Sequence, residues 1–274
     1  MERAVFFVSD RTGITAETLG LSLLTQFNGI KFKRHARRFV DTLEKAHAVG
    51  EEIRRAAAET GNQPIVFSTM IDDDMRRDVG AAANDCIFFD LVDTFIAPLE
   101  VALGQKSSHT IGRARGVVDQ SKYNLRMDAV NYALVTDDGL HTQDYNHADV
   151  IVLGVSRSGK TPTCLYLALT FGVYAANYPL TEDDLEDLRL PPALAGHRHQ
   201  LFGLSIDPER LQQIRRERKA EGVYSSLRQC QYEVSQAEAL FRQENIPSLA
   251  ATTMSVEEIA TTILHHMKLQ WRLS

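Results

Sequence analysis

The sequence ADVIVLGVSRSGKTPTCLYLALTF, residues 148–171, joins a short apolar run to a glycine-containing loop and then to a helical pattern. Residues 148–153 predict a buried strand. Residues 162–171 predict a helix, and Pro162 suits its first turn because the missing N–H costs little there. Between them GVSRSGKT, residues 154–161, matches the phosphate-binding loop pattern GxxxxGK[ST]. Strand, loop and helix in this order predict a nucleotide-binding α/β domain.

The chemistry of this loop depends on backbone amides and on two side chains. Glycines at its first and sixth positions let the chain turn so that successive N–H groups can point at an anion. Lys160 adds a positive charge for the terminal phosphates, and the Thr161 hydroxyl is suited to ligate Mg2+. The dipole of the following helix favours the same anion. We therefore expect the nucleotide to contact Gly154, Val155, Ser156, Arg157, Ser158, Gly159, Lys160 and Thr161.

Two adjacent carboxylates are candidates for the base that phosphoryl transfer requires. Asp137 and Asp138 lie shortly before the predicted strand and are followed by Gly139. Either carboxylate could accept the proton of an attacking hydroxyl. An ordinary Asp-Gly turn between strands is the competing interpretation, and the spacing alone favours it.

Positive charge and a second metal ligand complete the predicted catalytic set. Lys160 and Arg157 are the candidates to stabilise the transferring phosphoryl group, although Arg157 occupies a variable loop position that can also face solvent. Asp207 ends the apolar run LFGLSI after the loop. It is predicted either to ligate magnesium together with Thr161 or to cap the next helix.

Three further features have competing interpretations. Residues 9–13, SDRTG, join a strand to a helix, where open α/β sheets bind ligands, but they also fit a tight turn with Thr12 or Thr15 as the helix cap. Cys164 is expected to be a small packed residue, because no histidine accompanies it at the spacing of a nucleophile. Four arginines on one predicted helix are expected to form a solvated face: Arg210, Arg215, Arg216 and Arg218.

Composition excludes several classes of protein. The 274 residues include 44% hydrophobic residues, enough for a substantial core in one or two domains. The net charge of -6 argues against a general nucleic-acid or membrane-surface binder. Three cysteines without CxxC spacing favour a reducing compartment, and the histidines lack zinc spacing. With no long apolar segment or signal-like N-terminus, we expect a soluble, cytoplasmic protein.

Strands and helices alternate along the whole chain, which predicts mainly parallel sheets. We expect an N-terminal parallel-sheet α/β domain over residues 1–105 and a P-loop NTPase-like α/β domain over residues 106–274, with the boundary between 104 and 140. Residues 104–121 interrupt the pattern with a polar stretch. Predicted strands cover residues 4–8, a short run ending at 39–40, 65–70, 86–91, 148–153, 173–177, 201–206 and 248–251. Predicted helices cover residues 15–27, 42–60, 72–84, 92–103, 162–171, 208–219, 224–244 and 256–271, the last opened by a Ser255/Glu258 capping box.

Longer segments resemble a known family. The stretch ADVIVLGVSRSGKTPTCLYLALTFGVYAANYPL, with SDRTGITAETLG before it and LFGLSIDPERLQQIRRER and SVEEIATTIL after it, resembles the bacterial phosphoenolpyruvate synthase regulatory proteins. These are closely related to the pyruvate, phosphate dikinase regulatory proteins. The resemblance extends over residues 5–264, and GVSRSGKTP is its most specific segment. Ala250 stands where relatives are expected to carry Asn or Asp, and the GRARG segment lacks an expected His, so no role is carried over to Ala250 or Arg115.

The resemblance implies a bifunctional regulator. Such a protein phosphorylates a threonine of phosphoenolpyruvate synthase with ADP as the donor, which inactivates the synthase. It reverses the modification with inorganic phosphate and releases pyrophosphate. Residues 154–161 then correspond one by one to the ADP site, with phosphoenolpyruvate synthase as the protein partner. Apart from the resemblance, we expect Mg2+ as the metal and a homodimer as the assembly.

Other functions stay open from the residues alone. A P-loop kinase of a small metabolite and a nucleotide sensor without catalysis both fit the loop. A motor hydrolase fits less well, since LFGLSID is the nearest approach to the acidic apolar strand of that class. Only the resemblance separates the synthase from the dikinase as the target, and the sequence does not explain a preference for ADP over ATP.

Overall fold

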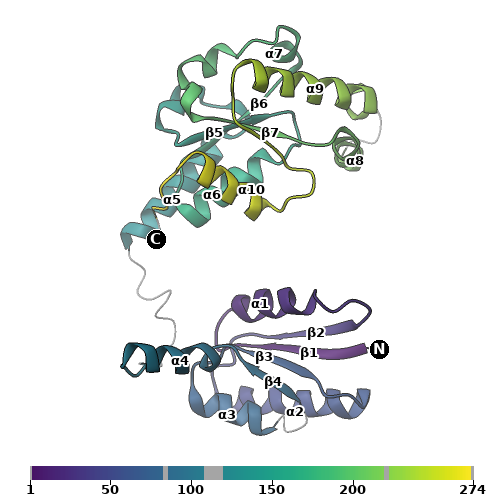
Figure 1. Ribbon diagram of the computed structural model, residues 1–274, viewed down its shortest axis with the longest axis vertical. Helices are drawn as coiled ribbons and strands as arrows, with labels where there is room; N and C mark the ends of the chain where they lie inside the picture. The colour runs from purple at the N-terminus through teal and green to yellow at the C-terminus, as the bar shows by residue number, and fades with distance from the viewer. Residues whose placement is uncertain (1, 83–85, 108–119, 219–221, 273–274) are drawn as a thin grey trace. The chain divides into compact units, whose positions relative to one another are not determined.

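The computed structural model describes residues 2–82, 86–107, 120–218 and 222–272 (Figure 1). The chain divides into two compact units, Met1–Gly116 and Val117–Ser274. Each unit has its own four-stranded parallel sheet, so the predicted α/β class is confirmed. The division falls within residues 108–119, which lie outside the described residues, as does Arg115 of the GRARG segment.

The first unit alternates strands and helices without interruption. Its elements are β1 (Glu2–Val8), α1 (Ile14–Leu24), β2 (Lys31–Arg37), α2 (Leu43–Thr60), β3 (Ile65–Ser68), α3 (Asp73–Ala82), β4 (Ile87–Asp90) and α4 (Asp93–Leu103). The strand order is β2-β1-β3-β4. The apolar run of β1 lies at the centre and is buried on both faces: Val5 and Phe7 contribute to one hydrophobic cluster, Phe6 and Val8 to the other.

The second strand of this unit differs from its prediction. It was predicted to end at Phe39 and Val40, but β2 ends at Arg37, and Phe39 adopts a left-handed backbone with φ 55°. The strand includes the basic run 31–34, because β2 lies at the sheet edge, where most of its side chains are exposed or half-buried. An edge strand tolerates charged residues that a central strand would exclude.

The second unit contains the predicted phosphate-binding loop between β5 and α6. Its elements are α5 (Gln120–Val135), η2 (Asp137–Gly139), η3 (Thr142–His147), β5 (Val150–Gly154), α6 (Lys160–Phe171), β6 (Ala175–Pro179), α7 (Glu182–Glu186), η4 (Pro192–Gln200), β7 (Leu201–Ser205), α8 (Pro208–Arg218), η5 (Val223–Ser225), α9 (Leu227–Gln243), β8 (Ser248–Ala250) and α10 (Val256–His266). The strand order is β6-β5-β7-β8.

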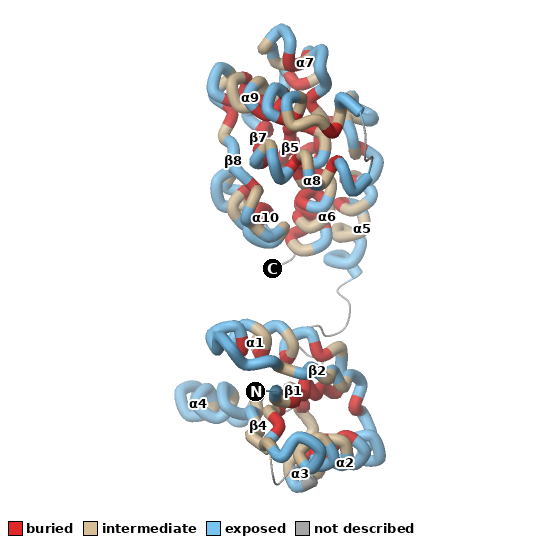
Figure 2. Tube along the Cα trace, turned by 90° about the vertical axis from the view of Figure 1, so that its right-hand side faces the viewer, coloured by how far each residue is buried: buried red, intermediate tan, exposed pale blue. Residues whose placement is uncertain are grey.

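Helices cover both faces of this second sheet. Val150 and Val152 of β5 pack with α5, α6 and α10, whereas Ile151 and Leu153 pack with α8 and α9 (Figure 1). Figure 2 shows the buried residues gathered along β5 and β7. The continuous apolar run of β5 therefore reflects burial on both faces, as expected for a parallel sheet. Within the described part of both units, no helix combines the length and the apolar character needed to cross a membrane.

Several helices of the second unit differ from the prediction, among them α5, α9 and α10. Helix α5 was not predicted; its buried residues are the small Ala129 and Ala133, so it lacks a stripe of large apolar side chains. Helix α9 begins at Leu227 rather than Tyr224, because the Ser226 side chain accepts a hydrogen bond from the backbone N–H of Gln229 and caps the helix there. Helix α10 ends at His266, short of the predicted Trp271.

The predicted capping box of α10 is confirmed and gives a stability prediction. Ser255 Oγ accepts from the Glu258 backbone N–H (3.2 Å), and Glu258 Oε2 accepts from the Ser255 N–H (2.7 Å). We expect Ser255→Ala to lower the free energy of unfolding by about 1 kcal/mol, because one N-terminal amide loses its partner. Urea unfolding monitored by circular dichroism measures this, with Ser255→Thr as the control that keeps the cap. An alanine variant as stable as the parent would contradict the prediction.

Candidate functional site

The candidate site is the loop that links β5 to α6. Strand and helix both lie where the sequence predicts them, and α6 begins at Lys160. Gly159, its N-cap residue, has φ 96° and no side-chain cap, so the amides of the first helical turn remain available to a ligand. An anion in front of this helix end would also be favoured by the helix dipole.

The loop is tightly packed against the neighbouring strand β7. A Cβ atom on Gly154 would lie 2.3 Å from the Leu204 carbonyl oxygen, so only glycine fits there. Arg157 has φ 76° and is exposed, so its side chain stays at the surface of the loop. Ser158 is buried, yet its Oγ has no hydrogen-bond partner among the described residues. A buried hydroxyl in this condition is suited to bind a ligand atom.

Lys160 is the buried cation of the loop. Its side chain is only 4% exposed, and its Nζ donates a hydrogen bond to the Val155 carbonyl (3.0 Å). Burial lowers the pKa of Lys160 to about 8, while the negative charge of Asp138 acts in the opposite direction. A phosphate beside this amine would favour its charged form. The structure therefore holds Lys160 folded back on its own loop, close to a carboxylate.

The structure brings Asp137 to the loop threonine. Thr161 Oγ1 donates to Asp137 Oδ1 (2.8 Å), and the same oxygen accepts from the Asn177 side-chain amide. Asp138 follows in η2 with φ 52°, and its backbone N–H donates to Asn177 Oδ1 (3.0 Å). Residues 137–139 therefore do not form a turn between strands; they form a short helix between α5 and η3 that faces the loop.

Asn177 was missed by the sequence analysis. It lies within β6, is fully buried and contacts both aspartates. The signal was present in the sequence, since AANYP places an amide inside an otherwise apolar strand. A buried amide needs partners, and those partners are the predicted catalytic residues.

A buried arginine supports the loop from the other side. Arg215 Nη2 donates to the Ser156 carbonyl (3.2 Å), and both Nη atoms donate to the Glu233 carboxylate (3.0 and 2.5 Å). The guanidinium stacks on the Tyr224 ring at 4.2 Å, and the Tyr224 hydroxyl is 3.1 Å from Ser156 Oγ. The prediction of a solvated face is wrong for Arg215, because Glu233 neutralises it in the interior. It is correct for the three exposed members of the set, Arg210, Arg216 and Arg218.

Comparison with known proteins identifies the family. A family model described as kinase/pyrophosphorylase matches residues 5–264. The chain belongs to the kinase/pyrophosphorylase family. A relative from Alkalilimnicola ehrlichii is 57% identical over 271 residues, which cover 99% of this chain and 98% of the relative. Relatives from Halorhodospira halophila (56%, with the same coverage) and Pseudomonas fluorescens strain Pf0-1 (52% over 264 residues, 96% of each chain) are similarly close.

The three relatives carry the name of a phosphoenolpyruvate synthase regulatory protein. The family resemblance inferred from the sequence is thus confirmed. Membership of the kinase/pyrophosphorylase family supports a kinase or other phosphotransferase activity for the chain. A loop with a buried lysine and a threonine bound to a carboxylate is consistent with that chemistry.

Two other residues that the sequence analysis considered, Asp207 and Cys164, make structural contacts in this kinase/pyrophosphorylase. Asp207 Oδ1 accepts from the backbone amides of Glu209 and Arg210, each at 3.0 Å, so the structure shows the helix-cap interpretation of this residue. Cys164 is buried, its Sγ lies 3.4 Å from the Ala176 carbonyl, and burial raises its pKa. It is the small packed residue expected from the sequence. No group of three or more His, Cys, Asp or Glu side chains in the described ranges is placed to hold a metal ion by itself.

The SDRTG segment bends between β1 and α1 in the first unit. Ser9 Oγ accepts from the Arg11 N–H (3.2 Å), and the buried Asp10 accepts from the Ile71 N–H (3.2 Å). Helix α1 is preceded by Gly13 with φ 72° and no side-chain cap. The expected cap from Thr12 or Thr15 is therefore wrong, since a left-handed glycine begins the helix instead.

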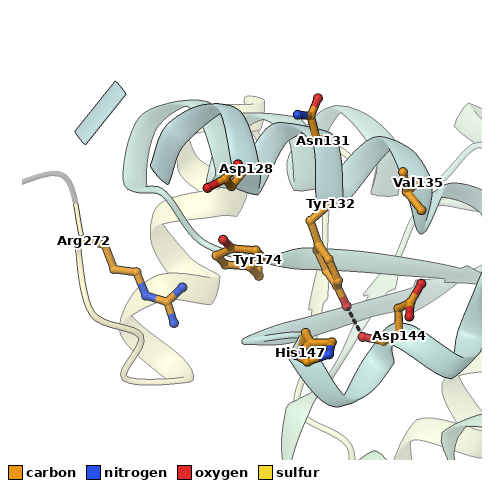
Figure 3. Close-up of a pocket in the computed structure, with 8 residues that line it drawn as sticks. All are labelled: Asp128, Asn131, Tyr132, Val135, Asp144, His147, Tyr174 and Arg272. Atoms are coloured by element: carbon orange, nitrogen blue, oxygen red, sulfur yellow. Dashed lines mark hydrogen bonds between the residues drawn. The ribbon is translucent and has the colours of Figure 1, made fainter. Parts of the chain in front are cut away.

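A separate cavity of about 550 Å3 lies in the second unit (Figure 3). Figure 3 shows Tyr132 and Tyr174 at its centre and Arg272 at one side. None of the loop residues 154–161 lines it; the lining residues are Asp128, Asn131, Tyr132, Val135, Asp144, His147, Tyr174 and Arg272. The cavity is thus distinct from the candidate phosphate site.

Proposed function

We propose that the chain is a bifunctional regulator of phosphoenolpyruvate synthase. It phosphorylates a threonine of the synthase with ADP, which inactivates the synthase, and removes that phosphate with inorganic phosphate. The observation that carries the proposal is the loop of this kinase/pyrophosphorylase, in which a buried Lys160 lies beside Thr161 and its partner Asp137. The names of the relatives support the synthase as the target.

The two reactions balance around one phosphate site. In the forward direction the threonine Oγ bonds to the β-phosphorus of ADP, the bond from that phosphorus to the bridging oxygen breaks, AMP leaves, and a base takes the hydroxyl proton. In the reverse direction an oxygen of inorganic phosphate bonds to the phosphorus of the phosphothreonine, the bond from that phosphorus to the threonine Oγ breaks, Oγ takes up a proton, and threonine and pyrophosphate are released. A cradle for the terminal phosphates of ADP also fits inorganic phosphate, so one site serves both directions.

The residues of the loop fit the terminal phosphates of ADP and inorganic phosphate. Three kinds of hydrogen-bond donor in the loop are not fully occupied by acceptors of the protein itself. They are the first-turn amides of α6, the Ser158 hydroxyl and the Lys160 amine. Arg157 is exposed on the loop, and we assign it to stabilise the transferring group once substrate binds.

Thr161 and Asp137 are the oxygen donors that would hold Mg2+, which prefers such ligands. Mg2+ supplies charge neutralisation at the phosphates when it is bound. Asp137 and Asp138 are the two carboxylates from which the proton acceptor is drawn.

Transfer of label decides the proposal. The purified chain is incubated with phosphoenolpyruvate synthase and ADP labelled in its β-phosphate, and label is expected on a synthase threonine with loss of synthase activity. Labelled synthase is then re-isolated and treated with unlabelled inorganic phosphate, which is expected to release labelled pyrophosphate. Parallel incubations replace the synthase with pyruvate, phosphate dikinase or with a mixture of small metabolites. Label on either of these but not on the synthase, or ADP binding without transfer, would each overturn the proposal.

A further inference from the structure

The buried amide of Asn177 contacts two successive aspartates through its two ends. Its Nδ2 donates to Asp137 Oδ1, and its Oδ1 accepts from the Asp138 backbone N–H at 3.0 Å. Its backbone carbonyl accepts from the Tyr145 hydroxyl (3.0 Å). Both ends of its side-chain amide are thus directed at η2, and strand β6 places the residue beside Val152 of β5.

These contacts hold the Asp137 carboxylate against the Thr161 hydroxyl. One oxygen of its carboxylate holds both the Thr161 hydroxyl and the Asn177 amide. Proteins with a loop of this kind hold the nucleotide's Mg2+ with the loop Ser or Thr and an aspartate. Asp207, the other aspartate considered for that role, uses its carboxylate to cap α8. Asp137 is therefore the carboxylate that reaches the expected metal ligand.

Asp138 directly follows Asp137, but it differs in backbone conformation and in the exposure of its side chain. Its backbone is in the left-handed region (φ 52°, ψ 35°), which is uncommon for a residue other than glycine, and Asn177 Oδ1 holds its N–H in that conformation. Its side chain is exposed, and its carboxylate accepts no hydrogen bond from the residues that the structure describes. An exposed carboxylate that directly follows Asp137, the partner of the loop threonine, is suited to meet an incoming hydroxyl.

We propose that Asn177 is a positioning residue that divides the work of the two aspartates: it turns Asp137 toward Thr161 to serve the divalent cation, and it presents Asp138 to the threonine hydroxyl as the proton acceptor. The division rests on the proposed function for the identity of the hydroxyl. The nucleotide half rests on it only for ADP as the nucleotide, and it is measured on the chain alone, without any protein substrate.

The test compares Asp137→Asn and Asp138→Asn in the full chain by two measurements. Calorimetry gives the ADP dissociation constant with and without Mg2+, and rapid mixing gives the single-turnover rate of phosphoryl transfer to the synthase. For Asp137→Asn we expect the tightening of ADP binding by Mg2+ to fall by about tenfold to a hundredfold. For Asp138→Asn we expect Mg2+-dependent binding within about twofold of the parent, with the transfer rate lower by roughly 10²–10⁴.

Asn177→Ala is expected to lower both the tightening of ADP binding by Mg2+ and the transfer rate. Circular dichroism checks that this variant folds. Asp144→Asn, a matched change on the neighbouring η3, is the control and should leave both unchanged. Equal loss of Mg2+-dependent binding in the two aspartate variants, or unchanged binding in Asp137→Asn, would overturn the division of roles even if the Asn177 variant fails to fold. If the binding pattern holds but the parent chain does not phosphorylate the synthase, the proposed function fails and the metal assignment stands.

Discussion

Replacing Lys160 with methionine is expected to abolish both phosphorylation of the synthase and its phosphate-dependent reversal. The amine is the buried positive charge of the loop, and both reactions develop negative charge on phosphate oxygens at the same place. Loss of one such interaction lowers rates by about 10²–10³-fold, so both rates should fall by at least that much. Rates of β-phosphate transfer from ADP and of pyrophosphate release measure the two directions.

The methionine variant separates catalysis from folding. Burial already disfavours the charged amine in the free protein, as the lowering of the Lys160 pKa to about 8 shows, so an apolar side chain of similar length should not destabilise the fold. We expect an unfolding midpoint at least equal to that of the parent. Lys160→Ala should also lose both activities, but it leaves a cavity. If either variant keeps one direction at the parent rate, the two reactions do not share a phosphate site.

The sequence alone was sufficient to predict the features that depend on residues close together in the chain. The phosphate-binding loop, its flanking strand and helix, and the α10 capping box each depend on residues within a few positions of one another. Helix α5 was missed because its contact with the core uses two alanines, which produce no apolar periodicity. The end of β2 was misplaced because edge strands can be polar, so hydrophobicity is a poor guide to their length.

The parts of the site that depend on tertiary contact were harder to predict. Asp137 and Asp138 could be proposed as catalytic residues, but their spacing alone favoured the role of a turn. Asn177 lies 40 positions after Asp137 and meets it only because β6 pairs with β5. Arg215 shares its helix with three exposed arginines, and only the partner Glu233 on α9 distinguishes it. A polar residue within an apolar strand was the signal for Asn177, whereas α8 is polar along most of its length and gave no such signal for Arg215.

Removing one member of the Arg215–Glu233 pair is expected to cause the largest loss of stability. Arg215 is fully buried, and Glu233 is 7% exposed, so Arg215→Met leaves a buried carboxylate without its partner and Glu233→Gln leaves a buried guanidinium. Each change should lower the free energy of unfolding by about 3–5 kcal/mol. Urea unfolding of the single variants measures this. Single variants with the stability of the parent would contradict it.

The double variant Arg215→Met/Glu233→Leu tests whether the pair supports ADP binding by the loop in addition to stabilising the fold. Apolar replacement of a whole buried pair is often neutral, so much of the lost stability should return. The hydrogen bond from Arg215 to the Ser156 carbonyl does not return, and we expect ADP to bind about tenfold more weakly because that charged donor is gone. Tyr224→Phe keeps the ring beside the guanidinium but removes the hydroxyl near Ser156 Oγ, so it measures the side-chain contact alone. A double variant that recovers stability and also binds ADP as the parent does would show that Arg215 supports the fold and not the phosphate-binding loop.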